Sequence, residues 1–155
     1  MNTEDLLLRK PGAGKLHYQT CGAQAGIAGL SRICDMLSED ELRHADALRA
    51  LQNGVRVELA QSPTLDGARR ILRTLCLRQN ALSNFHGDLG GYLSAMDFES
   101  KGVGICGQLA REAAHDWERE PLLKIAAQDE MHCTLIEQMR ELLAGELGDG
   151  VPDER

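Results

Sequence analysis

Two short stretches of the sequence place an acidic residue three positions before a histidine. Glu41 precedes His44 in DELRH (40–44), and Asp129 precedes His132 in QDEMH (128–132). At 3.6 residues per turn, positions i and i+3 lie on one side of a helix, about 4.5 Å apart along its axis. A carboxylate and an imidazole spaced in this way can bind one metal ion together.

The two stretches are related by a weak internal repeat. Shifting the chain by 88 positions places Glu41 on Asp129 and His44 on His132. The same shift aligns apolar positions on both sides of each pair. The chain is therefore predicted to contain two helical hairpins, each carrying one acid–histidine pair.

A third carboxylate, Glu99, interrupts the apolar stripe predicted to face the core in residues 86–114. Burying a carboxylate or an imidazole costs several kcal/mol unless it finds a metal ion or a hydrogen-bonding partner. Di-iron and di-manganese sites in four-helix bundles use a lone Glu from each of two helices and a Glu-x-x-His pair from each of the others. Five of these six ligand positions are filled, by Glu41, His44, Glu99, Asp129 and His132.

Helical periodicity predicts the elements that would position these residues. The chain has 43% hydrophobic but only 3% aromatic residues, which suits helices packed through aliphatic side chains better than a sheet sandwich. The prediction is a first helix interrupted at Pro11, long helices near 30–52, 86–114 and 118–147, and a short connecting helix at 66–75. Asp66 would cap the short helix. The fold class is therefore all-α, with one domain at 1–147 and a disordered polar tail at 148–155.

Three segments resemble the di-iron domain of rubrerythrin-type proteins in the ferritin-like superfamily. AMDFESK (95–101) is similar to the family's A-x-x-x-E pattern, and IAAQDEMHCTLIEQM (125–139) is similar to its A-x-x-E-x-x-H helix. SEDELRHADALRAL (38–51) resembles the version on the other hairpin. The resemblance covers residues 3–146 and implies a ferritin-like four-helix bundle made of two helical hairpins with a short connecting helix. It also implies a di-iron centre, with manganese or zinc as alternative metals.

The same resemblance implies an oxidoreductase that acts on peroxide or dioxygen, assembled as a homodimer. The chain has no rubredoxin-like cysteine set, so a separate protein would have to donate electrons. Pro11 stands 33 positions before His44, where the interval from Glu99 to His132 would place the remaining ligand. We therefore expect an incomplete ligand set and partial iron occupancy. The alternative is a non-catalytic ferritin-like bundle that has lost metal binding and serves in dimerisation or partner binding.

Composition excludes several other classes of protein. The formal net charge of -7 argues against nucleic-acid binding, which uses basic surfaces. No run of about eighteen apolar residues and no secretory signal is present, so neither a membrane span nor export is expected. The five cysteines form no C-x-x-C pair, which fits reduced thiols in the cytoplasm. A further acid–histidine pair, Glu112 and His115, is expected on the surface, and Trp117 is expected to anchor the core.

Overall fold

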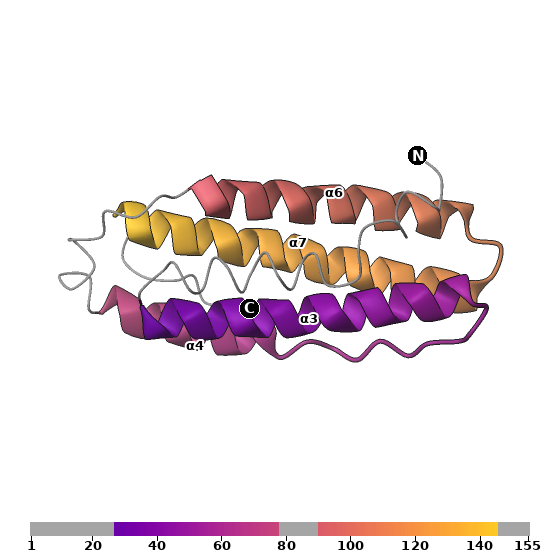
Figure 1. Ribbon diagram of the computed structural model, residues 1–155, viewed down its shortest axis with the longest axis horizontal. Coiled ribbons are helices and arrows are strands. Elements are labelled where there is room, and N and C mark those ends of the chain that lie inside the picture. Colours follow the sequence, from indigo (N-terminus) through magenta and orange to yellow (C-terminus); the bar gives the residue numbers. More distant parts are fainter. Residues whose placement is uncertain (1–26, 78–89, 146–155) are drawn as a thin grey trace.

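The computed structural model describes residues 27–77 and 90–145, and these residues form four helices without a strand. The helices are α3 (Ala28–Gln52), α4 (Thr64–Cys76), α6 (Gly90–Glu112) and α7 (Asp116–Ala144). Figure 1 shows α6 and α7 running side by side along the molecule, and α3 packs against α4 and α7. The all-α prediction is confirmed for this part of the chain. The predicted first helix, Pro11 and the tail from 148 lie outside it.

The residues at the helix ends show which sequence signals set the helix boundaries. Helix α3 stops at Asn53 and Gly54, where Gly54 adopts a φ of 72°, and Gly145 ends α7 with a φ of 73°. The prediction that Asp66 caps the short helix was wrong. Helix α4 begins two residues earlier, after Pro63, and the Thr64 N–H donates to Ser62 Oγ at 3.1 Å, which leaves Asp66 in the first turn.

Two apolar clusters fill the interior of the bundle. The larger cluster takes residues such as Leu37, Ala95 and Leu135 from the long helices, together with the inner face of α4. The smaller cluster consists of Ala47, Leu59, Cys106 and Ile125. On α3, α6 and α7 the stretch between the two clusters carries the buried acids and histidines, so the candidate site lies inside the bundle and not at its surface.

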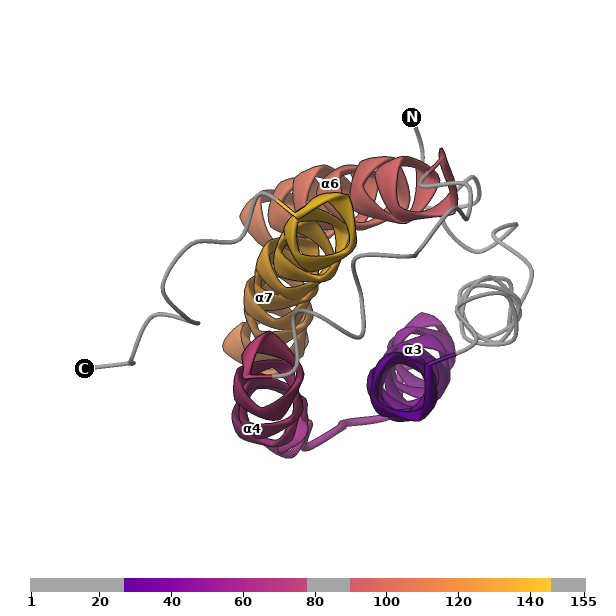
Figure 2. The same ribbon diagram turned by 90° about the vertical axis from the view of Figure 1, so that its left-hand side faces the viewer.

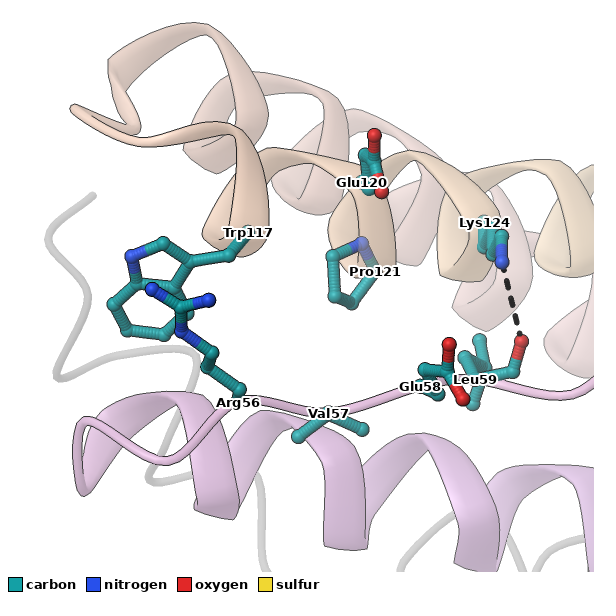
Figure 3. Close-up of a pocket in the computed structure, with 8 residues that line it drawn as sticks. All are labelled: Arg56, Val57, Glu58, Leu59, Trp117, Glu120, Pro121 and Lys124. Carbon is teal, nitrogen blue, oxygen red and sulfur yellow. Dashed lines mark hydrogen bonds between the residues drawn. The ribbon is translucent and has the colours of Figure 1, made fainter.

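An extended segment, residues 55–62, connects α3 to α4 and runs along α7. Lys124 Nζ donates to the Leu59 carbonyl at 3.5 Å, and Gln128 Nε2 donates to the Ala60 carbonyl at 3.1 Å. Figure 3 shows this segment and the start of α7 on either side of a pocket. The pocket has a volume of about 270 Å³, and the Arg56 guanidinium that lines it lies 5.7 Å from the centre of the Trp117 ring. The segment therefore holds α3 and α7 together at the level of the two acid–histidine motifs.

Two smaller predictions have different outcomes. Glu112 and His115 are exposed, as expected for a pair on the surface. Trp117 does not anchor the core. It is half-buried, its ring stacks against that of His115, and the Arg56 guanidinium lies 5.7 Å from the ring centre. Of the helices in residues 27–77 and 90–145, none combines the length and the apolar character needed to cross a membrane.

Candidate metal centre

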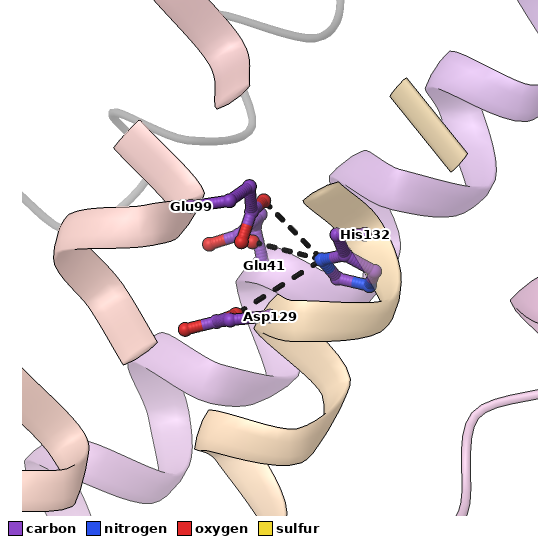
Figure 4. A group of neighbouring side chains, drawn as sticks. All are labelled: Glu41, Glu99, Asp129 and His132. Carbon is purple, nitrogen blue, oxygen red and sulfur yellow. Dashed lines mark hydrogen bonds and ion pairs between the residues drawn. The ribbon is translucent and has the colours of Figure 1, made fainter. Parts of the chain in front are cut away.

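Three helices bring four acid and histidine side chains to one point in the interior. Glu41 comes from α3, Glu99 from α6, and Asp129 and His132 from α7 (Figure 4). Each offers one ligand atom, and all four atoms lie within 4.8 Å of one another. Glu99 and His132 are fully buried, Asp129 is 5% exposed, and Glu41 is nearly buried. The four residues could therefore hold one metal ion out of contact with bulk water.

The cluster is arranged around Nδ1 of His132. This atom lies 3.2 Å from Glu99 Oε1, 3.3 Å from Glu41 Oε1 and 4.0 Å from Asp129 Oδ1. Ligands that bind a transition-metal ion at about 2.1 Å lie roughly 3 Å apart when adjacent and roughly 4.2 Å apart when opposite. The observed spacings span this range, so small side-chain movements would complete a coordination shell.

Unsatisfied polar atoms are the second indication that this is a cation site. Glu41 Oε1, Asp129 Oδ1 and His44 Nδ1 are buried and make no hydrogen bond. Buried polar groups in folded proteins are nearly always paired, since leaving one unpaired costs about 1–3 kcal/mol. All three atoms come from predicted ligand residues. Those of Glu41 and Asp129 belong to the group of four, and that of His44 lies beside Asp129.

The ionisation of the cluster reflects crowded carboxylates in a dry environment. Burial, reinforced by the charges of Glu41 and Asp129, raises the pKa of Glu99 to about 9. Burial opposes the charge of His132, but the neighbouring Glu41 and Glu99 outweigh it and raise the His132 pKa to about 9. Burial alone would also raise the pKa of Glu41, yet the adjacent His132 and Glu99 lower it. Both shifts favour the protonated form at neutral pH, that of Glu99 as well as that of His132.

Replacing a proton on Glu99 and a proton on His132 by one divalent cation would leave the net charge of the cluster unchanged. Loss of both protons removes two positive charges, and a divalent cation restores them. Because the net charge of the buried cluster would stay the same, metal binding would not add an uncompensated charge to the interior.

His44 stands at the edge of the group of four. Its Nδ1 lies 3.1 Å from Asp129 Oδ1 without hydrogen-bond geometry, and its ring stacks on that of His132 at a centroid distance of 5.7 Å. Of the five predicted ligands, four therefore converge on one point, and His44 reaches that point only through Asp129. Pro11, where the repeat would place a sixth ligand, lies outside the described residues.

Two residues that the sequence interpretation missed orient the histidines. His132 Nε2 lies 2.8 Å from Asp40 Oδ2, and His44 Nε2 lies 2.6 Å from Gln128 Oε1. Each histidine is thus held through Nε2 by the residue that immediately precedes the acid of the opposite motif. Partners of this kind fix the ring orientation and leave the other nitrogen free for a metal. Both Nδ1 atoms accordingly face the carboxylates.

Comparisons with protein-family models, with curated proteins and with solved structures gave no match. The class of protein is therefore defined by the fold and the site alone. It is an all-helical protein in which three helices surround a buried carboxylate–histidine cluster able to hold a metal ion. The pocket of Figure 3 shares no residue with this cluster.

Proposed function

We propose that the protein binds a divalent transition-metal ion through Glu41, Glu99, Asp129 and His132. The observation that carries the proposal is the convergence of two buried carboxylates, one nearly buried carboxylate and a buried imidazole, from three helices, within 4.8 Å. Acids gathered in a water-poor interior repel one another and need positive charge between them. A metal ion bound among the four side chains would supply that charge.

The donor set favours iron or manganese. Three carboxylates and one imidazole provide hard oxygen ligands and a single nitrogen, and no thiolate is among the four. Carboxylates suit manganese, and carboxylates combined with imidazole suit iron, whereas copper(I) selects sulfur ligands. Zinc would fit as a four-coordinate alternative. The unsatisfied His44 Nδ1 and Asp129 Oδ1 supply ligand atoms for a second ion beside the first.

We infer a rubrerythrin-like oxidoreductase that acts on peroxide or dioxygen as the activity. Bound iron would supply the redox chemistry for such a reaction. The chain itself contributes a dry site, ligands held by Asp40 and Gln128, and a Glu99 carboxyl that holds a proton at neutral pH. The support is the resemblance of the three quoted segments and the helical placement of the cluster. A homodimer that receives electrons from a separate protein belongs to the same proposal.

A non-catalytic helical bundle is the second candidate, and one observation favours it. With Glu99 neutral and protonated His132 beside Glu41, the charges of the cluster are already largely balanced without a metal ion. A bundle of this kind would retain the buried hydrogen-bonded network after losing metal binding, and would serve in dimerisation or partner binding.

Metal analysis separates the two candidates. Protein purified without tag or chelator should hold between one and two iron ions per chain after anaerobic Fe(II) loading, and His132→Ala should lose them. His115→Ala is the matched control, because His115 is an exposed histidine on the same helical hairpin. If wild type retains no more iron than His132→Ala, the metal-binding proposal is wrong and the non-catalytic bundle stands.

A further inference from the structure

The two histidines of the centre are held by unequal partners. His132 Nε2 faces the carboxylate of Asp40, and both side chains are fully buried. Asp40 in turn pairs with Arg43 and accepts a hydrogen bond from Ser62 Oγ at 2.6 Å. The carboxylate is therefore anchored on two further sides and cannot easily turn away from His132.

His44 has a neutral partner instead. Gln128 Oε1 faces His44 Nε2 at 2.6 Å, while Gln128 Nε2 donates to the Ala60 carbonyl at 3.1 Å. Because the amide nitrogen is used by Ala60, the amide oxygen must face His44, so His44 donates from Nε2. The 55–62 segment thus fixes both partners, Asp40 through Ser62 and Gln128 through Ala60.

This difference makes the two imidazoles unequal as metal ligands. A carboxylate that accepts an N–H raises the basicity of the other ring nitrogen, and charge-assisted hydrogen bonds are roughly twice as strong as neutral ones. The surroundings of the two Nδ1 atoms also favour His132 as the stronger metal ligand. Nδ1 of His132 lies near Glu41, Glu99 and Asp129, whereas the carboxylate beside Nδ1 of His44 is Asp129.

We propose that the chain binds two divalent ions in a fixed order, the first at His132 and the second at His44, and that Asp40 and Gln128 set the difference in affinity. This inference rests on the proposed metal binding. The first ion takes the four converging ligands, and the second takes His44 and shares Asp129. Asp40 and Gln128 act as positioning residues, because they touch the histidines and not the ion.

Calorimetric titration with Co²⁺ tests the order of binding on chelator-treated protein. Wild type should show two steps, and Asp40→Asn should weaken the first step by about 10–100-fold, the usual effect of losing such a partner. Gln128→Leu should weaken only the second step, and His44→Ala should remove it. Asp35→Asn is the control, since Asp35 is an exposed aspartate on the same helix and loses the same charge. Circular dichroism of each metal-free variant establishes that it is folded.

The outcomes distinguish this inference from the proposed function. A single binding step in wild type, or equal shifts of both steps in Asp40→Asn and Gln128→Leu, would overturn the fixed order while leaving metal binding intact. Unchanged titrations in both variants would also overturn it. The absence of any binding step in wild type would instead remove the proposed function and this inference together.

Discussion

Replacing Glu99 by glutamine separates the stability of the buried cluster from its ability to bind metal. Glu99 is fully buried, and burial raises its pKa to about 9. At neutral pH the folded chain therefore holds it as a neutral carboxyl group, which glutamine matches closely in shape and charge. We expect metal-free Glu99→Gln to fold normally, yet to lack one of the three carboxylate ligands.

The size of the effect on the free energy of unfolding follows from the difference between the pKa of Glu99 in the folded and unfolded states. Unfolding returns Glu99 to its ordinary pKa of 4.5, so between pH 4.5 and about 9 the unfolded chain releases a proton that the folded chain keeps. The Glu99 contribution to the free energy of unfolding therefore falls by about 1.4 kcal/mol for each pH unit above 4.5, a loss of at most about 3.5 kcal/mol at pH 7. Glutamine releases no proton, so the margin by which metal-free Glu99→Gln exceeds wild type should grow with pH.

Urea denaturation in the presence of a chelator, from about pH 5 to pH 8, measures this margin. Glu130→Gln changes an exposed glutamate on α7, so its free energy of unfolding should depend on pH in the same way as that of wild type. Mn²⁺ at about 100 times its dissociation constant should stabilise wild type by about 2.7 kcal/mol and Glu99→Gln by much less. A metal-free Glu99→Gln that is less stable than wild type at every pH would refute the neutral carboxyl. Equal stabilisation by Mn²⁺ would refute its role as a ligand.

Further predictions concern the same network and its scaffold. His132 has a folded pKa of about 9 against 6.5 unfolded, so its contribution to metal-free stability should be complete below pH 6.5 and lost as pH rises through about 9, in urea titrations. Calorimetry in buffers of different ionisation enthalpy should detect protons released when the first ion binds near neutral pH, because Glu99 and His132 have raised pKa values. Leu37→Ala, in the fully buried core, should cost about 2–5 kcal/mol of unfolding free energy, whereas exposed Leu123→Ala should change it by less than about 0.5 kcal/mol. Gly145→Ala should cost about 1 kcal/mol, because alanine is strained at a φ of 73°.

Local sequence signals predict much of the fold, and the rest depends on the path of the non-helical connecting segments. The apolar stripe and the Asn-Gly stop predict α3 well, because both are properties of the helix itself. Helix α4 starts at Thr64, directly after Pro63, and the Thr64 N–H donates to Ser62 Oγ. Asp66 therefore lies inside the first turn and is not the N-cap. The position of Trp117 depends on the path of the 55–62 segment, and no periodic pattern in an extended connection specifies that path.

The candidate site divides in the same way. Glu41, Glu99, Asp129 and His132 could be selected because each interrupts an apolar stripe whose inward direction the helical period defines. Asp40 and Gln128 lie one position away from those stripes, so their burial depends on how the opposite helix packs. One signal could have found them: they occupy the same place in DELRH and QDEMH, directly before the acid, and the 88-residue shift superimposes them.

Anomalous scattering from crystals of Mn²⁺-loaded protein tests the central claim most directly. We predict a manganese peak in the interior between α3, α6 and α7, at about 2.2 Å from His132 Nδ1 and from carboxylate oxygens of Glu41, Glu99 and Asp129. The same crystals of His132→Ala should show that peak weakened or lost. Manganese found only on surface carboxylates, with His132 still hydrogen-bonded to Glu99, would contradict metal binding at the buried cluster.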